Sequence, residues 1–212
     1  MPKMSTAHLE ARRTEILDAA ETCFIRKGLH QTTMHDICEE AQLSPGAVYR
    51  YFDSKEDLID AVAERRTQQE MQFIDEAKAQ TSRAAEALTV LGDRFWGQFL
   101  RPDFEHWARL DIEIWPETLR NPRHQARVRE QRSMLRQALA DVCRLAIEQG
   151  TMRVEADPET MANLLMALYR GLQLHKAIDP AVDTNGIFSL LAMTALRPAE
   201  SKGRQATKVR SR

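Results

Sequence analysis

Residues 33–58 read TMHDICEEAQLSPGAVYRYFDSKEDL, and this stretch contains the start signals of two neighbouring helices. Thr33 is followed three residues later by Asp36, a variant of the capping box that closes the N-terminus of a helix. Ser44 is a good N-cap, and Pro45 suits the first helical position because its missing N–H would have no partner there. Because the two starts are close together, the sequence predicts two short helices joined by a tight turn.

A further helix, expected over about residues 7–27, precedes this pair. Apolar side chains recur along it at helical spacing, among them Ile16, Cys23 and Phe24. Gly28 suits the left-handed position just past a helix end. Two short helices bury little surface alone, so we expect the longer helix to cover them. This is the layout of a helix-turn-helix, in which the second helix of the pair enters the major groove of DNA.

Proline and glycine divide the rest of the chain into more helices, and no convincing period-two stretch indicates a strand. The helices expected after the first cover about residues 34–41, 45–52, 54–79, 81–100, 103–115, 122–149, 157–178 and 185–196. In this interpretation Pro102, Pro116 and Pro180 each end the helix that precedes them. The predicted fold class is therefore all-α, with about nine helices.

We expect a helix-turn-helix domain over residues 1–53 and a larger helical domain over residues 54–196. Residues 197–212 form a tail with six basic residues and one acid, and its polar composition indicates disorder. The net charge of the whole chain is −1, so the tail contributes +5 and the remaining residues −6. An acidic body does not attract DNA through its overall field, so a local face must bind it.

The sequence argues against an enzyme and against a membrane protein. It has no N-terminal signal pattern and no apolar run near the ~20 residues that span a bilayer, so we expect a soluble cytoplasmic protein. The six histidines are scattered, and no nucleophile–base pair, metal-ligand spacing or glycine-rich phosphate loop is present. We therefore expect no catalytic residue, no metal site and no cofactor. A protein-interaction adaptor that uses the first domain for another partner is the alternative class.

The three cysteines, Cys23, Cys38 and Cys143, have no metal-ligand spacing. Their odd number and a reducing compartment argue against a disulfide framework. We interpret them as small buried apolar residues, with a redox sensor as the alternative.

Three segments at fixed spacing resemble the DNA-binding segment of the TetR family of repressors: Thr33–Ile37, Ala41–Phe52 and Ser54–Leu58. The resemblance covers about residues 10–60, and the rest of the chain is similar to the family in helix number and length. It implies an Ω-shaped homodimer that binds a pseudo-palindromic operator in double-stranded DNA. It also implies that the larger domain binds a small effector, and that the last two long helices of each subunit form a four-helix dimer bundle.

The resemblance and the chemistry of the side chains together define the expected DNA contacts. The expected residues are Thr33, His35, Ser44, Pro45, Gly46, Ala47, Tyr49, Arg50, Tyr51 and Lys55. The small residues at the start of the recognition helix let the backbone approach the bases. Tyr49 and Tyr51 lie on different helix faces, so at least one is exposed, and we expect Tyr49 to contact a phosphate. Arg50 can bind guanine or phosphate with its guanidinium. His35 and Lys55 suit a base edge and a phosphate, respectively, with solvated side chains as the alternative.

Large side chains concentrate in the middle of the chain and suggest a ligand pocket. The expected ligand-binding residues are Trp96, Phe99, Trp107, Asp111, Trp115, Tyr169 and Gln173. Asp111 lies between two tryptophans at helical spacing, which is typical of an aromatic cage for a cationic or hydrogen-bonding ligand. The alternatives are a surface salt bridge, to Arg109 or to an arginine of the next helix, and tryptophans that are simply core. Because pockets between helices are mostly apolar, we expect a small, largely apolar effector.

The helix expected over residues 122–149 is rich in arginine, and we interpret this side as solvated, with Met134 on the opposite, core side. The last two expected helices are strongly apolar and indicate either a dimer interface or intrachain core. An effector that binds the DNA-incompetent dimer more tightly than the competent one lowers operator affinity. The sequence leaves the opposite sense, a co-repressor or an activator, open.

Overall fold

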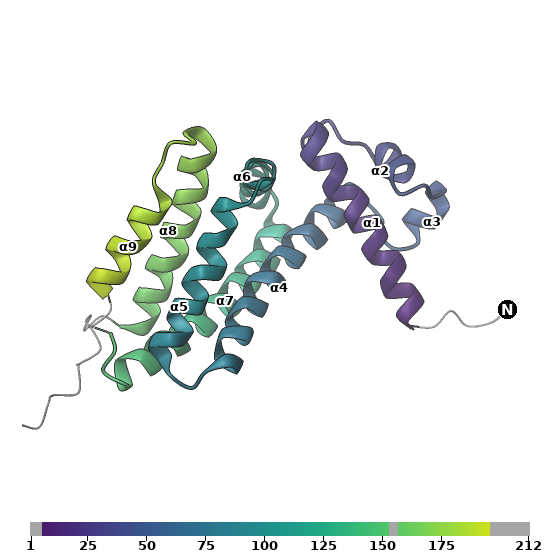
Figure 1. Cartoon of the computed structure of the whole chain (residues 1–212). Helices are drawn as coiled ribbons and strands as arrows, with labels where there is room; N and C mark the ends of the chain where they lie inside the picture. The colour runs from purple at the N-terminus through teal and green to yellow at the C-terminus, as the bar shows by residue number, and fades with distance from the viewer. Residues whose placement is uncertain (1–5, 153–156, 196–212) are drawn as a thin grey trace, which may run out of the picture.

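The computed structural model describes residues 6–152 and 157–195, and the fold is all-α in these ranges. The regular elements there are α1 (Thr6–Lys27), α2 (Met34–Glu40), α3 (Pro45–Tyr49), α4 (Lys55–Gln80), α5 (Ala84–Gly97), the 3-10 helix η1 (Gln98–Leu100), α6 (Phe104–Arg120), α7 (Pro122–Glu148), α8 (Pro158–Ile178) and α9 (Thr184–Ala195). Helices α1–α3 form a small head, and α4 runs from it into a bundle with α5–α9 (Figure 1). The prediction of an all-α chain of about nine helices is confirmed. The predicted tail, residues 197–212, lies outside the described residues.

The start signals in the sequence act as N-caps in the structure. The Thr33 hydroxyl accepts a hydrogen bond from the Asp36 backbone N–H at 3.2 Å, and the Asp36 carboxylate accepts one from the Thr33 N–H at 2.8 Å. Ser54 caps α4 by accepting from the Asp57 N–H at 3.1 Å. Ser44 takes the N-cap position of α3 without a side-chain hydrogen bond, and Pro45 follows it at the first helical position. These local signals place the head helices within a few residues of the predicted bounds.

The head and the bundle share one hydrophobic core. Buried side chains of α1, α2 and α3, such as Phe24, Ile37 and Val48, form its centre. The same cluster continues into α4 through Leu58 and into α6 through Leu110, both fully buried. The predicted division between residues 53 and 54 therefore runs through continuous apolar packing, and α4 belongs to both parts.

The bundle packs α4, α5, α7 and α8 around a second core, and α9 covers α5 from outside. Trp96 of α5 stacks on Phe188 of α9 with ring centroids 4.6 Å apart, and its indole N–H donates to the Thr184 carbonyl at 2.8 Å. Gly92 permits this approach, because a Cβ there would lie only 2.2 Å from the Phe188 ring. Between α4 and α7, Asp60 forms ion pairs with His124 and, at 2.9 Å, with Arg127.

Several helix bounds differ from the prediction. α6 continues through Pro116 to Arg120, whereas the proline was expected to end it. Pro116 is exposed, while Ile114 and Thr118 continue the buried face of the same helix, so packing outweighs the lost hydrogen bond. α3 ends at Tyr49 rather than near residue 52, and the last turn of the fifth predicted helix is the 3-10 helix η1.

Two further predictions concern exposure. Met134 was predicted to lie on the core side of α7. It is 58% exposed, so the buried face of α7 is narrower than predicted. The three cysteines are free and buried, which agrees with their interpretation as small apolar residues. In the part of the chain that the structure describes, no helix combines the length and apolarity needed to cross a bilayer.

Candidate nucleic-acid interface and ligand cavity

The exposed side of the head is formed by α3 and the start of α2. Ser44, Pro45 and Gly46 are exposed at the beginning of α3, and a Cβ at Gly46 would meet no atom within 4 Å. The tight turn before α3 places Gln42 in the left-handed region at φ 53°. Val48 faces inward and is fully buried. The start of α3 therefore has small, exposed side chains, and Val48 holds the helix to the core on its opposite face, as a groove-binding helix requires.

The polar side chains of the predicted interface differ in their exposure and in the partners that they contact. Tyr49 is 47% exposed, whereas Tyr51 packs partly against the head core, in line with their different faces. Arg50 is exposed and forms no ion pair within residues 6–152 and 157–195, so its guanidinium is available. His35 is exposed and lies 3.2 Å from Glu39 one turn later. Ala47 is partly buried. Arg50 and Tyr49 thus combine exposure with hydrogen-bonding groups.

Lys55 has a different role from the predicted phosphate contact. Its ammonium group donates to the carbonyl oxygens of Leu29 at 2.9 Å and Thr32 at 3.1 Å, with His30 at 3.4 Å. Three acceptors use the three hydrogens of the ammonium. The side chain therefore fastens the start of α4 to the turn between α1 and α2, which sequence spacing alone did not reveal.

The same turn is held from the bundle by α6. The Leu29 N–H donates to the Glu113 carboxylate at 2.7 Å, and the Glu113 carboxylate also lies against Gly28, whose φ is +82°. One turn further along α6, Glu117 lies 3.5 Å from His30. α6 therefore contacts directly the segment that leads into the helix-turn-helix.

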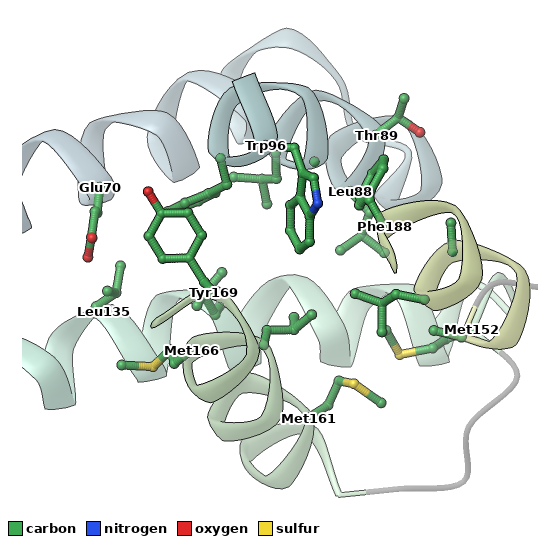
Figure 2. Close-up of a pocket in the computed structure, with 18 of the residues that line it drawn as sticks. Glu70, Leu88, Thr89, Trp96, Leu135, Met152, Met161, Met166, Tyr169 and Phe188 are labelled. Atoms are coloured by element: carbon green, nitrogen blue, oxygen red, sulfur yellow. The ribbon is translucent and has the colours of Figure 1, made fainter. Parts of the chain in front are cut away.

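A cavity of about 280 Å³ lies within the bundle, between α4, α5, α7, α8 and α9 (Figure 2). Its lining is Glu70, Leu88, Thr89, Leu91, Gly92, Phe95, Trp96, Arg132, Leu135, Leu139, Met152, Met161, Leu165, Met166, Tyr169, Phe188, Leu191, Ala192 and Ala195. Most of this surface is aliphatic, aromatic or thioether. Figure 2 shows Glu70 and the Tyr169 hydroxyl toward one end, with Met152 and Phe188 toward the other. The cavity is thus apolar with a polar end, the usual form of a small-molecule site.

The polar end borders a buried cluster of charges. Arg170 of α8 donates to Glu70 of α4 at 2.5 Å and to Asp111 of α6 at 3.2 Å. Arg66 of α4 donates to the same Asp111 oxygen at 3.0 Å, and Arg132 lies 3.5 Å from the second Glu70 oxygen. The cluster ties three helices of the bundle to α6, the helix that holds the Leu29 turn.

Burial and charge shape the protonation of these groups. Burial alone would raise the pKa of Asp111, but Arg66 and Arg170 outweigh it and hold the pKa below its usual value. Burial raises the pKa of the Tyr169 hydroxyl to about 12, so it remains a neutral donor. Burial, aided by the charge of Arg170, lowers the pKa of Arg132 to about 10, which still leaves it protonated at neutral pH.

The structure brings together only part of the predicted ligand site. Trp96 and Tyr169 line the cavity, and Phe99 packs behind them, 5.4 Å from the Tyr169 ring. Gln173 is buried and donates to Asp111 at 3.1 Å, so its amide supports the charge cluster. Phe99 and Gln173 are not part of the cavity lining.

The predicted aromatic cage does not form around a free carboxylate. Asp111 is buried and occupied by Arg66 and Arg170, so the alternative of a surface salt bridge to Arg109 or to the next helix is also wrong. Trp107 donates to Asp103 and lies under the Arg66 guanidinium. Trp115 is 39% exposed and borders a separate cavity of about 50 Å³.

Sequence reasoning missed Glu70, Arg132 and most of the apolar residues that line the cavity. Glu70 stands in a polar stretch of α4, and its partner Arg170 is a hundred residues away. Arg132 was interpreted as part of a solvated face, yet its side chain is only 19% exposed. The methionines of the lining were a usable signal, because flexible thioethers suit variable apolar pockets.

Helices α8 and α9 lie at the end of the molecule away from the head (Figure 1), and both carry exposed apolar side chains. They are Leu164, Leu174, Ile178, Leu190 and Met193, each more than 40% exposed. Gly171 lies on α8 without any atom near a would-be Cβ. Such a patch is typical of an interface with another protein surface.

Comparison with known proteins places both parts of the chain. The family model described as bacterial regulatory proteins, tetR family, matches residues 16–62. The model described as the C-terminal part of BetI-type transcriptional repressors matches residues 94–196, so the two together match more than half of the chain.

The described residues contain no group of three histidine, cysteine or acidic side chains that would hold a metal ion.

Individual proteins are similar along most of their length. The HTH-type transcriptional regulator YfiR of Bacillus subtilis is 27% identical over 171 residues, 81% of this chain and 82% of the relative. A Saccharomonospora viridis protein described as a transcriptional regulator, solved with choline, superposes with a TM-score of 0.73 at 21% identity over 90% of this chain and all of that one. SmeT, a repressor from Stenotrophomonas maltophilia solved with triclosan, gives a TM-score of 0.65 at 25% identity over 89% and 93%.

Proposed function

Because the chain belongs to the TetR family of transcriptional regulators, we propose that it is a repressor that binds a pseudo-palindromic operator as a homodimer and is released by a small, largely apolar effector. The chain is a DNA-binding regulator and not an enzyme. The operator, the homodimer and the effector are the steps that we infer, each from a separate feature.

The exposed start of α3 carries the proposal for DNA. Its small residues Pro45, Gly46 and Ala47 allow close approach to base edges, with Arg50 free to bind guanine or phosphate and Tyr49 free to bind phosphate. Ser44 adds a hydroxyl that makes no cap hydrogen bond and is suited to a phosphate, whereas the Thr33 hydroxyl and N–H are already bound to Asp36. Because so few cations are available per head, one head would bind weakly, which favours two linked copies on adjacent half-sites.

The apolar patch on α8 and α9 supports the homodimer. Side chains such as Leu174, Ile178 and Leu190 would bury their surface against the same face of a second copy. A self-complementary interface of this kind sets a fixed spacing between two recognition helices. Replacement of Leu190 by glutamate should give a monomer in sedimentation experiments and cost operator affinity.

The cavity supports the effector, since its volume and apolar lining suit a small organic molecule. Two structural neighbours were solved with small molecules, choline in one and triclosan in the other. Among the predicted ligand residues we retain Trp96 and Tyr169 for this site, with Phe99 behind them.

The route from cavity to head runs through the charge cluster. Glu70 and Arg170 at the polar end connect to Asp111 of α6. Two residues along α6, Glu113 holds the Leu29 turn. On α4, Arg65 beside Arg66 pairs with Asp18 and Glu21 of α1. A ligand that shifts α4 and α6 would thus move the head, and it lowers operator affinity if it prefers the shifted state.

A gel-shift with DNA from upstream of the protein's own gene tests the proposal. Sequence-specific binding that weakens steeply with salt and disappears with Arg50→Ala supports it. Arg83→Ala, an exposed arginine at the N-cap position of α5 and far from the head, serves as the matched control and should bind normally. Absence of sequence-specific binding to any DNA would favour the adaptor instead.

A further inference from the structure

The cavity ends at a carboxylate oxygen that makes no hydrogen bond to any residue in the part of the chain that the structure describes. Glu70 is 8% exposed and lines the cavity, and its Oε1 is bound by Arg170 at 2.5 Å. Its Oε2 is buried and forms no hydrogen bond within the described residues, since Arg132 stands off at 3.5 Å. A buried acceptor left without a donor is costly, so this oxygen is suited to receive a donor from a ligand.

Donors border the same end of the cavity. The Tyr169 hydroxyl points toward Glu70 (Figure 2) and makes no hydrogen bond to the described residues. Arg132 also lines the cavity, and among the described residues its guanidinium forms an ion pair with Glu70 and lies over the Trp115 ring at 5.9 Å. A ligand group at this end therefore meets an open acceptor and open donors together.

Charged end groups fit this arrangement poorly. A carboxylate would come to lie beside Glu70 Oε2, and burying two like charges together is unfavourable. An ammonium would face Arg132 and Arg170, which together with Arg66 give the cluster three cations against two carboxylates, those of Glu70 and Asp111. A hydroxyl both donates and accepts, and it brings no charge into the interior.

We propose that the effector site is selective for an apolar molecule that ends in one uncharged hydroxyl, an alcohol or a phenol, which donates to Glu70 and accepts from Tyr169. This inference rests on the proposed function, because it assigns a ligand class to the same cavity. The apolar body lies along Phe95, Trp96 and the methionines, and the hydroxyl completes the polar end.

Titration calorimetry of the full chain with ligands that differ only in the end group tests this selectivity. The series is 1-octanol, octanoate, octylammonium and methyl octyl ether. We expect 1-octanol to bind at least about tenfold tighter than each of the others, a difference of ~1.4 kcal/mol. The ether is the sharpest comparison, because it accepts a hydrogen bond but cannot donate to Glu70. Equal or tighter binding of octanoate, octylammonium or the ether overturns the proposal.

Two variants locate the selectivity. Glu70→Gln removes the negative charge at similar volume, so octanoate should gain at least about tenfold relative to 1-octanol. Glu76→Gln, a partly exposed carboxylate on the same helix that pairs with Arg94 and does not line the cavity, is the matched control and should keep the original preference. Because Glu70→Gln removes the ion pair to Arg170, Tyr169→Phe provides a milder variant that keeps the aromatic packing and should weaken 1-octanol several-fold. Unchanged preference in both variants places the selectivity elsewhere and contradicts the proposal.

The failures of the two proposals are distinguishable. If the protein binds its operator but none of the four ligands, the hydroxyl site is wrong and the repressor stands. If 1-octanol binds with the stated preference while no operator is bound, the ligand site stands and the repressor proposal fails.

Discussion

The Glu113 carboxylate accepts a hydrogen bond from the Leu29 backbone N–H at 2.7 Å, across 84 positions of sequence. This contact joins α6 of the bundle to the turn that leads into the helix-turn-helix. Asp111, on the same helix, is held by arginines of α4 and α8. One helix thus touches both the charge cluster at the cavity and the base of the DNA-binding head.

Glu113→Ala should alter operator affinity although the residue lies outside the predicted DNA interface. The partly buried Leu29 N–H loses its acceptor, and we expect a stability loss of about 1–3 kcal/mol. The measurements are thermal unfolding and operator titration by fluorescence anisotropy. Glu117→Ala is the control one turn later, because its partners, Arg120 at 3.0 Å and His30 at 3.5 Å, are both exposed. Equal effects of the two substitutions would contradict a specific role for the Glu113 contact.

Arg50→Ala and Tyr49→Ala should each abolish the operator shift and leave the dimer intact. Both side chains are exposed, and neither supports the head core. If Arg50 contacts a phosphate, the dependence of log affinity on log salt should also fall by about 1 per subunit. Gel-shift titrations at several salt concentrations and size-exclusion chromatography provide the readouts. Full operator affinity in both variants would show that the recognition helix is misassigned.

Lys55→Met separates the structural role of Lys55 from the predicted phosphate contact. Loss of charge-assisted hydrogen bonds to the Leu29 and Thr32 carbonyls should lower stability by roughly 1–3 kcal/mol. Urea unfolding measures this loss. A variant of normal stability with a reduced salt dependence of operator binding would instead restore the phosphate assignment.

Gly92→Ala should push α9 away from α5, because its Cβ would overlap the Phe188 ring. Overpacking of this kind costs about 1–3 kcal/mol. The double variant with Phe188→Leu should recover part of the stability, since a smaller side chain vacates the overlap. Thermal unfolding of the two single variants and the double variant checks the coupling, and strictly additive effects would argue against this close approach.

The cysteines should react with Ellman's reagent only after unfolding. Burial raises the pKa of the Cys143 thiol to about 11, and burial also raises the pKa values of Cys23 and Cys38. At pH 8 the Cys143 thiol is therefore thiolate in roughly one molecule in a thousand, and only the thiolate reacts. Rapid modification of the native protein would revive the redox-sensor alternative.

The head was predictable because its signals are local. Thr33 with Asp36 and Ser44 with Pro45 set helix starts within a few residues, and the turn between them leaves little freedom. Helical spacing also identified the buried face of α1, which includes Phe24. The fate of Lys55 was not predictable, because its carbonyl partners become available only once the turn has folded.

The cavity was much less predictable, since its residues come together from five helices. Trp96 and Tyr169 stood out as large side chains with polar atoms, and the structure places both in the lining. Asp111 stood out for the same reason, but three-dimensional packing supplies it with Arg66 and Arg170. Periodicity identifies the buried face of a helix, and it does not identify which helix lies opposite.

The core that α1–α3 share with α4 and α6 has a practical consequence for engineering sensors from this scaffold. In a chimaera joined after residue 53, the helices α1–α3 of one protein would pack against the positions of Leu58, Leu110 and Ile114 in another protein. An exchange of α1–α3 must therefore also include the residues of α4 and α6 that pack against them. In this molecule the packing of the head on the bundle depends on a few apolar side chains that both parts share.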